Sequence, residues 1–139
     1  MKTGIVVFAH GSSVASANRA VEVVAGQMAR DGGFDLVIAA FLEQARPDLR
    51  EAVESLVGQG ARRVLVIPYF LTLGIHLQRD LPRIAGELAG AHPGVEIRVT
   101  NPLDGHPALA AILVGRAREA LDAWGGACSD PPRATEPPA

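Results

Sequence analysis

Short apolar runs alternate along the chain with stretches in which apolar residues recur at helical spacing. The apolar runs are rich in Val, Ile, Leu and Ala and predict strands over residues 4–9, 34–41, 64–67 and 95–100. Each run is followed by a helical pattern, and these patterns predict helices over residues 14–30, about 47–57, about 80–89 and 107–124. Because every strand is followed by a helix, the chain is predicted to be an α/β protein.

The repeated strand–helix unit predicts a single-domain, parallel four-stranded sheet flanked by helices on both faces, over residues 1–125. Right-handed crossovers reduce the possible topologies, and we expect the flavodoxin-like strand order 2-1-3-4. Ligands of such sheets bind at the carboxyl ends of the strands, beside the point between strands one and three where the order reverses. Residues 126–139 are rich in Pro and polar residues and are expected to form a disordered tail.

Three local signals set the expected helix starts. Ser12 and Ser13 are N-cap candidates for the first helix. Pro47 and Pro82 are expected in the first turns of the second and third helices, where a missing N–H costs nothing. The segment 72–76 is then expected to be a loop.

Composition narrows the function classes. Of 139 residues, 48% are hydrophobic and 20% charged, which is typical of a globular protein. The net charge of −2 and the lack of a basic run argue against a dedicated nucleic-acid surface. The single Cys128 excludes an internal disulfide and a Cys-rich metal site. The first apolar run is too short to span a membrane, so we expect a cytoplasmic protein with no membrane partner.

Histidine and glutamate residues follow the predicted strands. His10 follows the first strand, Glu43 the second, and His76 and His106 lie in the loops after the third and fourth. Gly11 permits a tight turn and the close approach of a ligand. If His10 and His76 lie on adjacent strand ends, they can share one ligand or one metal ion.

Each of these residues also has an ordinary interpretation. His10 could hydrogen-bond a neighbouring loop, Glu43 could be a solvated carboxylate, and His106 could belong to a turn and helix start. His92 precedes a proline at the far end of a helix and is expected to be a solvated loop histidine. A hydrolase or phosphatase would depend on His10 and Ser12, but the Gly-x-Ser-x-Gly elbow is absent. The phosphate-binding Gly-rich motifs are absent as well.

Four sequence blocks, in order along the chain, resemble the short sirohydrochlorin chelatases of the CbiX/SirB-like type, which are class II chelatases. The blocks are Phe8–Ser12; Ala40–Glu43 with Arg46-Pro47; Ile67–Leu71 with Gly74–His76 and Asp80–Pro82; and, more weakly, Pro102–Pro107. The resemblance implies a chelatase-like fold and a lyase that inserts divalent cobalt or ferrous iron into sirohydrochlorin, in cobalamin or sirohaem biosynthesis. A metal- or tetrapyrrole-binding module without catalysis is the alternative.

The resemblance also implies roles for particular residues. His10 would be a metal ligand and proton acceptor, and His76 the second metal ligand. Beyond the resemblance, we add Glu43, which would assist His10 in accepting protons. The tetrapyrrole would be bound by Arg46, Leu71, Thr72, Leu73, Gly74, Ile75 and His76.

No permanently bound cofactor is expected, because the divalent metal (Co²⁺, Fe²⁺ or Ni²⁺) is a substrate. A single small domain offers only a shallow cleft to a flat macrocycle. Two copies facing each other would cover both sides of the ring, so a homodimer is expected.

Overall fold

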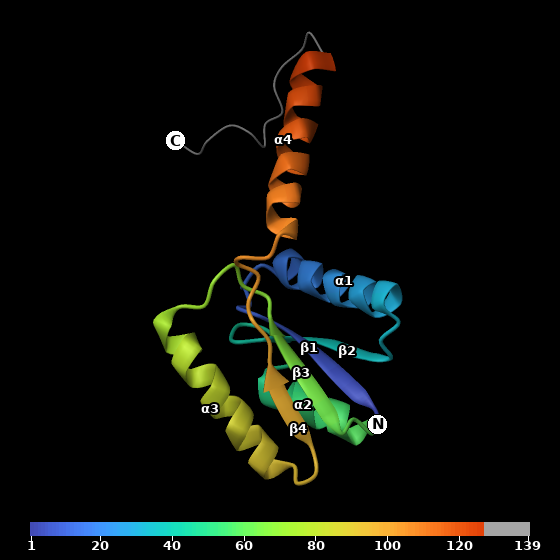
Figure 1. The fold of residues 1–139 in the computed structure, drawn as a ribbon, viewed down its shortest axis with the longest axis vertical. Helices are drawn as coiled ribbons and strands as arrows, with labels where there is room; N and C mark the ends of the chain where they lie inside the picture. Colours follow the sequence, from blue (N-terminus) through green and yellow to red (C-terminus); the bar gives the residue numbers. More distant parts are fainter. Residues whose placement is uncertain (127–139) are drawn as a thin grey trace. The chain divides into compact units, whose positions relative to one another are not determined.

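The computed structural model describes residues 1–126 (Figure 1). The elements are β1 (Thr3–Ala9), α1 (Ala15–Gly32), β2 (Leu36–Phe41), α2 (Leu49–Gly58), β3 (Arg63–Pro68), α3 (Ile75–Ala91), β4 (Glu96–Val99) and α4 (Ala108–Gly126). None of the helices in this part of the chain has the length and apolar character needed to cross a membrane.

The chain divides into two compact units. The first, Met1–Leu103, contains the whole sheet with α1, α2 and α3, and the second begins at Asp104 and contains α4. A single domain over residues 1–125 stays a prediction. Apart from Gly126, the predicted tail 126–139 and its Cys128 lie outside the described residues.

The sheet confirms the predicted topology. Its strand order is β2-β1-β3-β4, and every neighbouring pair is parallel. β1 is central and buried along almost its entire length, which explains why its sequence is a continuous apolar run with no polar alternation. The carboxyl ends of β1, β2 and β3 therefore meet at one edge of the sheet, where the predicted site residues follow them.

Helices cover both faces of the sheet in the first unit. Successive residues of β1 point to opposite faces: Val7 belongs to an apolar cluster with Val21 of α1, and Phe8 to another with Val53 of α2 and Leu81 of α3. α1 thus packs on one face, and α2 and α3 pack on the other (Figure 1). The central strand β1 is thus buried from both sides, as its apolar sequence predicts, whereas the edge strand β4 is partly exposed.

The third helix begins earlier than predicted. α3 starts at Ile75, so His76 lies in its first turn and not in a loop, and Pro82 lies inside the helix. A proline in a helix interior removes one backbone hydrogen bond. The buried stripe of Leu81, Ala85 and Leu88 extends past Pro82 and anchors the helix to the sheet, so the helix continues across the proline.

The first two helix starts also differ from the prediction. The N-cap of α1 is Val14, without a side-chain cap bond, so neither Ser12 nor Ser13 caps the helix. Pro47 lies outside α2, after a cis Arg46–Pro47 peptide, and the N-cap of α2 is Asp48. β2 and β4 begin at Leu36 and Glu96, each one or two residues later than predicted.

A reciprocal capping box fixes the start of α2. The Asp48 side chain accepts a hydrogen bond from the Glu51 N–H at 2.8 Å, and Glu51 Oε1 accepts one from the Asp48 N–H at 3.0 Å. These bonds satisfy donors that the first turn of a helix leaves without intrahelical partners. The capping box therefore also ends the loop that carries Glu43.

We predict that Asp48→Ala lowers the free energy of unfolding by about 1 kcal/mol, the usual cost of losing a side-chain cap. Urea unfolding followed by circular dichroism measures this change. Glu54→Ala on the same helix, at a side chain with no hydrogen bond in the described chain, is the matched control and should change stability by less than about 0.5 kcal/mol. Equal effects of the two substitutions would contradict the assigned role of the cap.

Candidate active site at the carboxyl edge of the sheet

His10 and Glu43 are brought together by the backbone. The hydrogen-bond ladder between β1 and β2 continues beyond both strands: the Leu42 N–H donates to the Ala9 carbonyl at 2.9 Å, and the Glu43 N–H donates to the His10 carbonyl at 3.0 Å. The two side chains consequently meet, with 3.6 Å between His10 Nε2 and Glu43 Oε1. Both remain more than half exposed, at 59% and 54%, so a ligand can reach them.

Gly11 is required for this approach. Its φ of +92° is a conformation that glycine adopts far more readily than other residues. A Cβ at this position would lie only 1.8 Å from the Glu43 carbonyl oxygen. The turn after β1 can therefore contact the loop after β2 only because residue 11 lacks a side chain.

Two further contacts orient the His10 ring. Its Nδ1 lies 3.2 Å from the Gly11 carbonyl oxygen, and its ring plane meets that of Phe70 edge-on, at a centroid distance of 6.4 Å and an angle of 72°. A carbonyl oxygen can only accept a hydrogen bond, so Nδ1 carries the proton in this contact. In the neutral ring, the lone pair is then on Nε2, the nitrogen that faces Glu43.

The gap between Nε2 and the Glu43 carboxylate suits a cation or a proton. A lone pair and an ionised carboxylate oxygen are both acceptors, so neither satisfies the other. When two donor atoms bind the same metal ion, each at about 2.1 Å and at a tetrahedral angle to the other, they lie about 3.4 Å apart. The observed separation of 3.6 Å is close to that value.

The predicted pairing of His10 with His76 is not among the contacts of the structure. His76 is exposed in the first turn of α3 and makes no ion pair or side-chain hydrogen bond within residues 1–126. In the same residues, no group of three or more His, Cys, Asp or Glu side chains lies close enough together to hold a metal ion. The structure therefore joins His10 to Glu43, and the role of His76 stays a prediction.

Arg46 is engaged within its own loop. Its guanidinium donates to Glu51 Oε2 at 2.7 Å, while the side chain as a whole remains 83% exposed. Glu51 Oε1 is occupied by the capping box. The predicted binding of substrate by Arg46 stays a prediction, and a substrate carboxylate would have to compete with Glu51 for the guanidinium.

Large apolar side chains are exposed in several segments at the edge of the sheet where His10 and Glu43 lie. They follow the strands at this edge or stand at the start of the next helix. We call this set the apolar rim: Val14, Leu42, Tyr69, Leu71 and Ile75. Leu71 and Ile75, both predicted to bind substrate, are 65% and 70% exposed. Leu73, also predicted, packs partly against the core, and its carbonyl accepts a bond from Gln78 Nε2.

The other members of the apolar rim were not predicted. Polar turn residues are usual directly after a strand, where Leu42 and Tyr69 lie, and directly before a helix, where Val14 lies. That departure from the usual pattern was the signal in the sequence that could have identified them.

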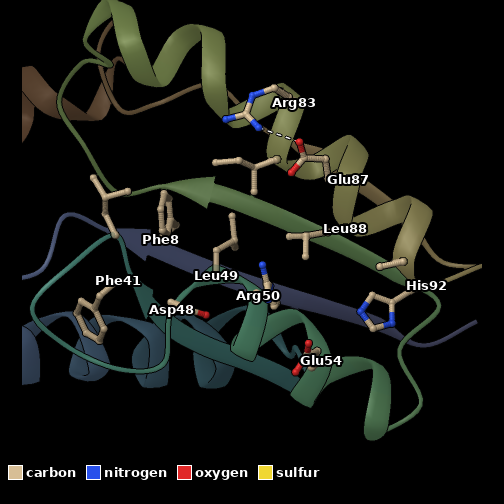
Figure 2. A pocket seen from close by; sticks show the side chains of 13 residues that line it. Phe8, Phe41, Asp48, Leu49, Arg50, Glu54, Arg83, Glu87, Leu88 and His92 are labelled. Carbon is tan, nitrogen blue, oxygen red and sulfur yellow. Dashed lines mark hydrogen bonds and ion pairs between the residues drawn. The ribbon is translucent and has the colours of Figure 1, made fainter.

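A groove of about 720 Å³ lies between α2 and α3 (Figure 2). Phe8 and Leu42 line one end, and His92, the C-cap of α3, lines the other. Figure 2 shows Arg83 and Glu87 of α3 paired across its rim, at 2.8 Å. Neither His10, Glu43 nor His76 lines this groove, so its size alone does not make it the reactive site.

The remaining polar candidates have local structural roles. The Ser12 hydroxyl accepts a bond from the Val14 N–H at 3.0 Å, and the Asn18 side chain bonds both the N–H and the carbonyl of Ser12. His106 Nδ1 accepts a bond from the Ala108 N–H at 3.0 Å, which favours the interpretation of a turn and helix start. Ser12 therefore stabilises the turn before α1. Its hydrogen bonds go to Val14 and Asn18 and not to His10, so it lacks the partner that would activate it as a nucleophile.

Comparison with known proteins identifies relatives over most of the chain. The profile of the CbiX family matches residues 4–120. The sirohydrochlorin cobaltochelatase of Methanosarcina barkeri is 32% identical over 127 residues, which cover 86% of this chain and 98% of that protein. The chloroplastic sirohydrochlorin ferrochelatase of Arabidopsis thaliana is 31% identical, over 85% of this chain and 52% of that longer protein.

Solved structures share the fold. A CbiX protein from Marinobacter aquaeolei VT8 superposes with a TM-score of 0.76 at 32% identity, covering 86% of this chain and 98% of that chain. SirB from Bacillus subtilis subspecies spizizenii, in complex with cobalt, superposes with a TM-score of 0.78. That match covers 86% of this chain and 51% of SirB, and at 24% identity it supports the fold alone.

We predict that Gly11→Ala separates His10 from Glu43 and destabilises the protein. The control is Gly33→Ala, because Gly33 also has a positive φ, +67°, but a Cβ there would meet nothing within 4 Å. The control should cost roughly 1–2 kcal/mol for the backbone conformation alone. Gly11→Ala should cost on the order of 1–3 kcal/mol more, because the added Cβ overpacks the loop. Urea unfolding of both variants tests this, and equal losses would refute the close approach.

Proposed function

Because the chain belongs to the CbiX family, we propose that it is a metal chelatase that inserts a divalent metal ion, cobalt or ferrous iron, into sirohydrochlorin. The proposal is supported by relatives named sirohydrochlorin cobaltochelatase and sirohydrochlorin ferrochelatase. The structural observation that carries it is the exposed His10–Glu43 pair, 3.6 Å apart, at a sheet edge bordered by the apolar rim. This arrangement combines donors for a metal ion with a surface for a flat, largely apolar ring.

Metal insertion requires groups that bind a metal ion weakly and groups that accept protons. The tetrapyrrole loses two pyrrole N–H protons as the ion enters, and the ion loses the ligands that it arrives with. His10 Nε2 faces Glu43 with its lone pair free, so it can hold the ion or receive a proton. Glu43 lies beside it, can share either task, and can pass the proton to water because it is half exposed.

We assign His76 as the second metal ligand. It is exposed in the first turn of α3, in the segment 71–76, which also carries Leu71 and Ile75 of the apolar rim. A small set of imidazole and carboxylate donors leaves coordination positions open, so the ion can be handed to the macrocycle and is not retained. Imidazole and carboxylate ligands accept cobalt, nickel and iron, so these residues alone do not choose the metal.

The macrocycle would lie against the apolar rim. Leu71 and Ile75 present the most exposed apolar surface of the predicted binding segment 71–76, and they would pack on the face of the ring. Sirohydrochlorin has carboxylate side chains, and Arg46 would bind one of them, because its guanidinium remains exposed beyond its contact with Glu51. The product would be a cobalt or iron tetrapyrrole, for cobalamin or sirohaem synthesis respectively.

We also propose a cytoplasmic homodimer. One rim covers one face of a flat ring, and a second copy facing it would cover the other face and remove the exposed apolar side chains from water. The 14.5 kDa chain would thus complete its site with its own copy.

We predict that His10→Ala, Glu43→Gln and His76→Ala each lower the chelatase rate by on the order of 100-fold or more, the usual contribution of a group that transfers protons. The measurement is the absorbance change of sirohydrochlorin with Co²⁺ or Fe²⁺, corrected for spontaneous insertion. His92→Ala is the control, because His92 lies at the far end of α3, and it should keep the native rate. A native protein that does not exceed spontaneous insertion would refute the proposed activity.

We predict that sedimentation equilibrium at assay concentration gives twice the 14.5 kDa mass of one chain. Leu71→Glu should shift the equilibrium to monomer, because it buries a charge in the proposed interface. Val23→Glu, at an exposed apolar residue of α1, is the control and should remain dimeric. A native monomer would contradict the dimer, and a dimeric Leu71→Glu variant would exclude the apolar rim as its interface.

A further inference from the structure

Phe70 connects the apolar core to the reactive edge. It lies two residues after β3 and is partly buried against the core cluster on the α2–α3 face. Its ring contacts that of Phe8 at a centroid distance of 6.1 Å and that of His10 at 6.4 Å. Phe70 therefore touches both a fully buried side chain and the exposed imidazole.

The strand register explains why these rings meet. Phe8 is level with Pro68 across the β1–β3 pair. Two residues further along each segment, just beyond the strand ends, come His10 and Phe70. The backbone on both sides of Phe70 is fixed, because the Tyr69 N–H donates to the Phe8 carbonyl at 2.7 Å and the Leu103 N–H donates to the Phe70 carbonyl at 3.0 Å.

An imidazole that is mostly exposed needs such a contact to keep one orientation. The His10 side chain is 59% exposed, and its one hydrogen bond, from Nδ1 to the Gly11 carbonyl, is 3.2 Å long. A half-turn of the ring about the Cβ–Cγ bond would put Cδ2 in the place of Nδ1 and Cε1 in the place of Nε2, and would break that bond. The bond therefore selects which edge of the ring faces Glu43, but by itself it leaves the ring free to tilt. The edge-on contact with Phe70, at an angle of 72°, restricts the plane of the ring.

We propose that Phe70 is a positioning residue for His10: its ring fixes the imidazole plane so that Nε2 faces Glu43 across the gap where the metal ion binds. The inference rests on the proposed role of His10 as a metal ligand and adds a residue that acts only through His10. Partners that orient metal-ligating histidines commonly contribute 10–100-fold to metal affinity or activity. Phe70 would be an apolar residue with the same task.

The experiment measures Co²⁺ binding without tetrapyrrole, by isothermal titration calorimetry and by the visible spectrum of the bound ion. Phe70→Leu and Phe70→Met remove the ring but keep an apolar side chain, and Phe70→Tyr keeps the ring. Phe34→Leu removes a half-exposed phenylalanine elsewhere in the chain and is the matched control. We expect Co²⁺ to bind about tenfold more weakly to the Leu and Met variants, and as in the native protein to the Tyr and Phe34 variants.

Steady-state kinetics provide a second readout. A residue that positions His10 without touching the macrocycle should lower kcat in the Leu and Met variants and leave the KM for sirohydrochlorin unchanged. In a His10→Ala background, adding Phe70→Met should cause no further loss of Co²⁺ affinity, because the residue that Phe70 orients is absent.

Each outcome decides for or against the inference. If Phe70→Leu and Phe70→Met fold with a lowered unfolding midpoint but bind Co²⁺ like the native protein, Phe70 only packs the core and the inference is wrong. Equal losses in the Leu, Met and Tyr variants, or a raised KM with unchanged kcat, overturn it as well. If His10→Ala itself binds Co²⁺ normally, the ligand assignment under the proposed function fails first. A loss in His10→Ala without a loss in the Phe70 variants rejects the positioning role alone.

Discussion

The continuation of the β1–β2 hydrogen-bond ladder beyond both strands is the constraint on which the site depends. It makes His10 and Glu43 neighbours through backbone bonds, so the sheet sets the positions of their backbones, and the side-chain orientations are set by other contacts. Gly11 permits the two loops to approach, and the central, buried β1 gives them a fixed base. Reactive groups at the end of a rigid strand can be accurately placed and still open to solvent.

The architecture could be predicted from the sequence because β1, β2 and β3 are largely apolar runs, which are typical of strands buried in a parallel sheet. Helix starts were less predictable. Pro82 was interpreted as a first-turn residue, yet the apolar stripe Leu81, Ala85 and Leu88 holds the helix on both sides of it. The same error placed His76 in a loop when it lies in the first turn of α3. Local signals at a helix end are weak, and packing against the sheet overrides them.

The candidate site was predictable in its location but not in its contacts. His10 and Glu43 could be assigned to one edge from strand order alone, whereas their pairing depends on a register that no residue pattern specifies. The contact of Phe70 with His10 likewise requires the β1–β3 register. The groove of about 720 Å³ between α2 and α3 is lined by neither His10, Glu43 nor His76, so a large cavity and the reactive groups need not coincide.

Glu51 divides two tasks between its two carboxylate oxygens. Oε1 completes the capping box of α2, and Oε2 holds the guanidinium of Arg46. A carboxylated ligand that drew Arg46 away would therefore vacate one oxygen and leave the helix cap intact. The loop between β2 and α2 can exchange an internal ion pair for an external one while the helix behind it stays in register, so ligand capture at this corner is mechanically separate from the stability of the fold.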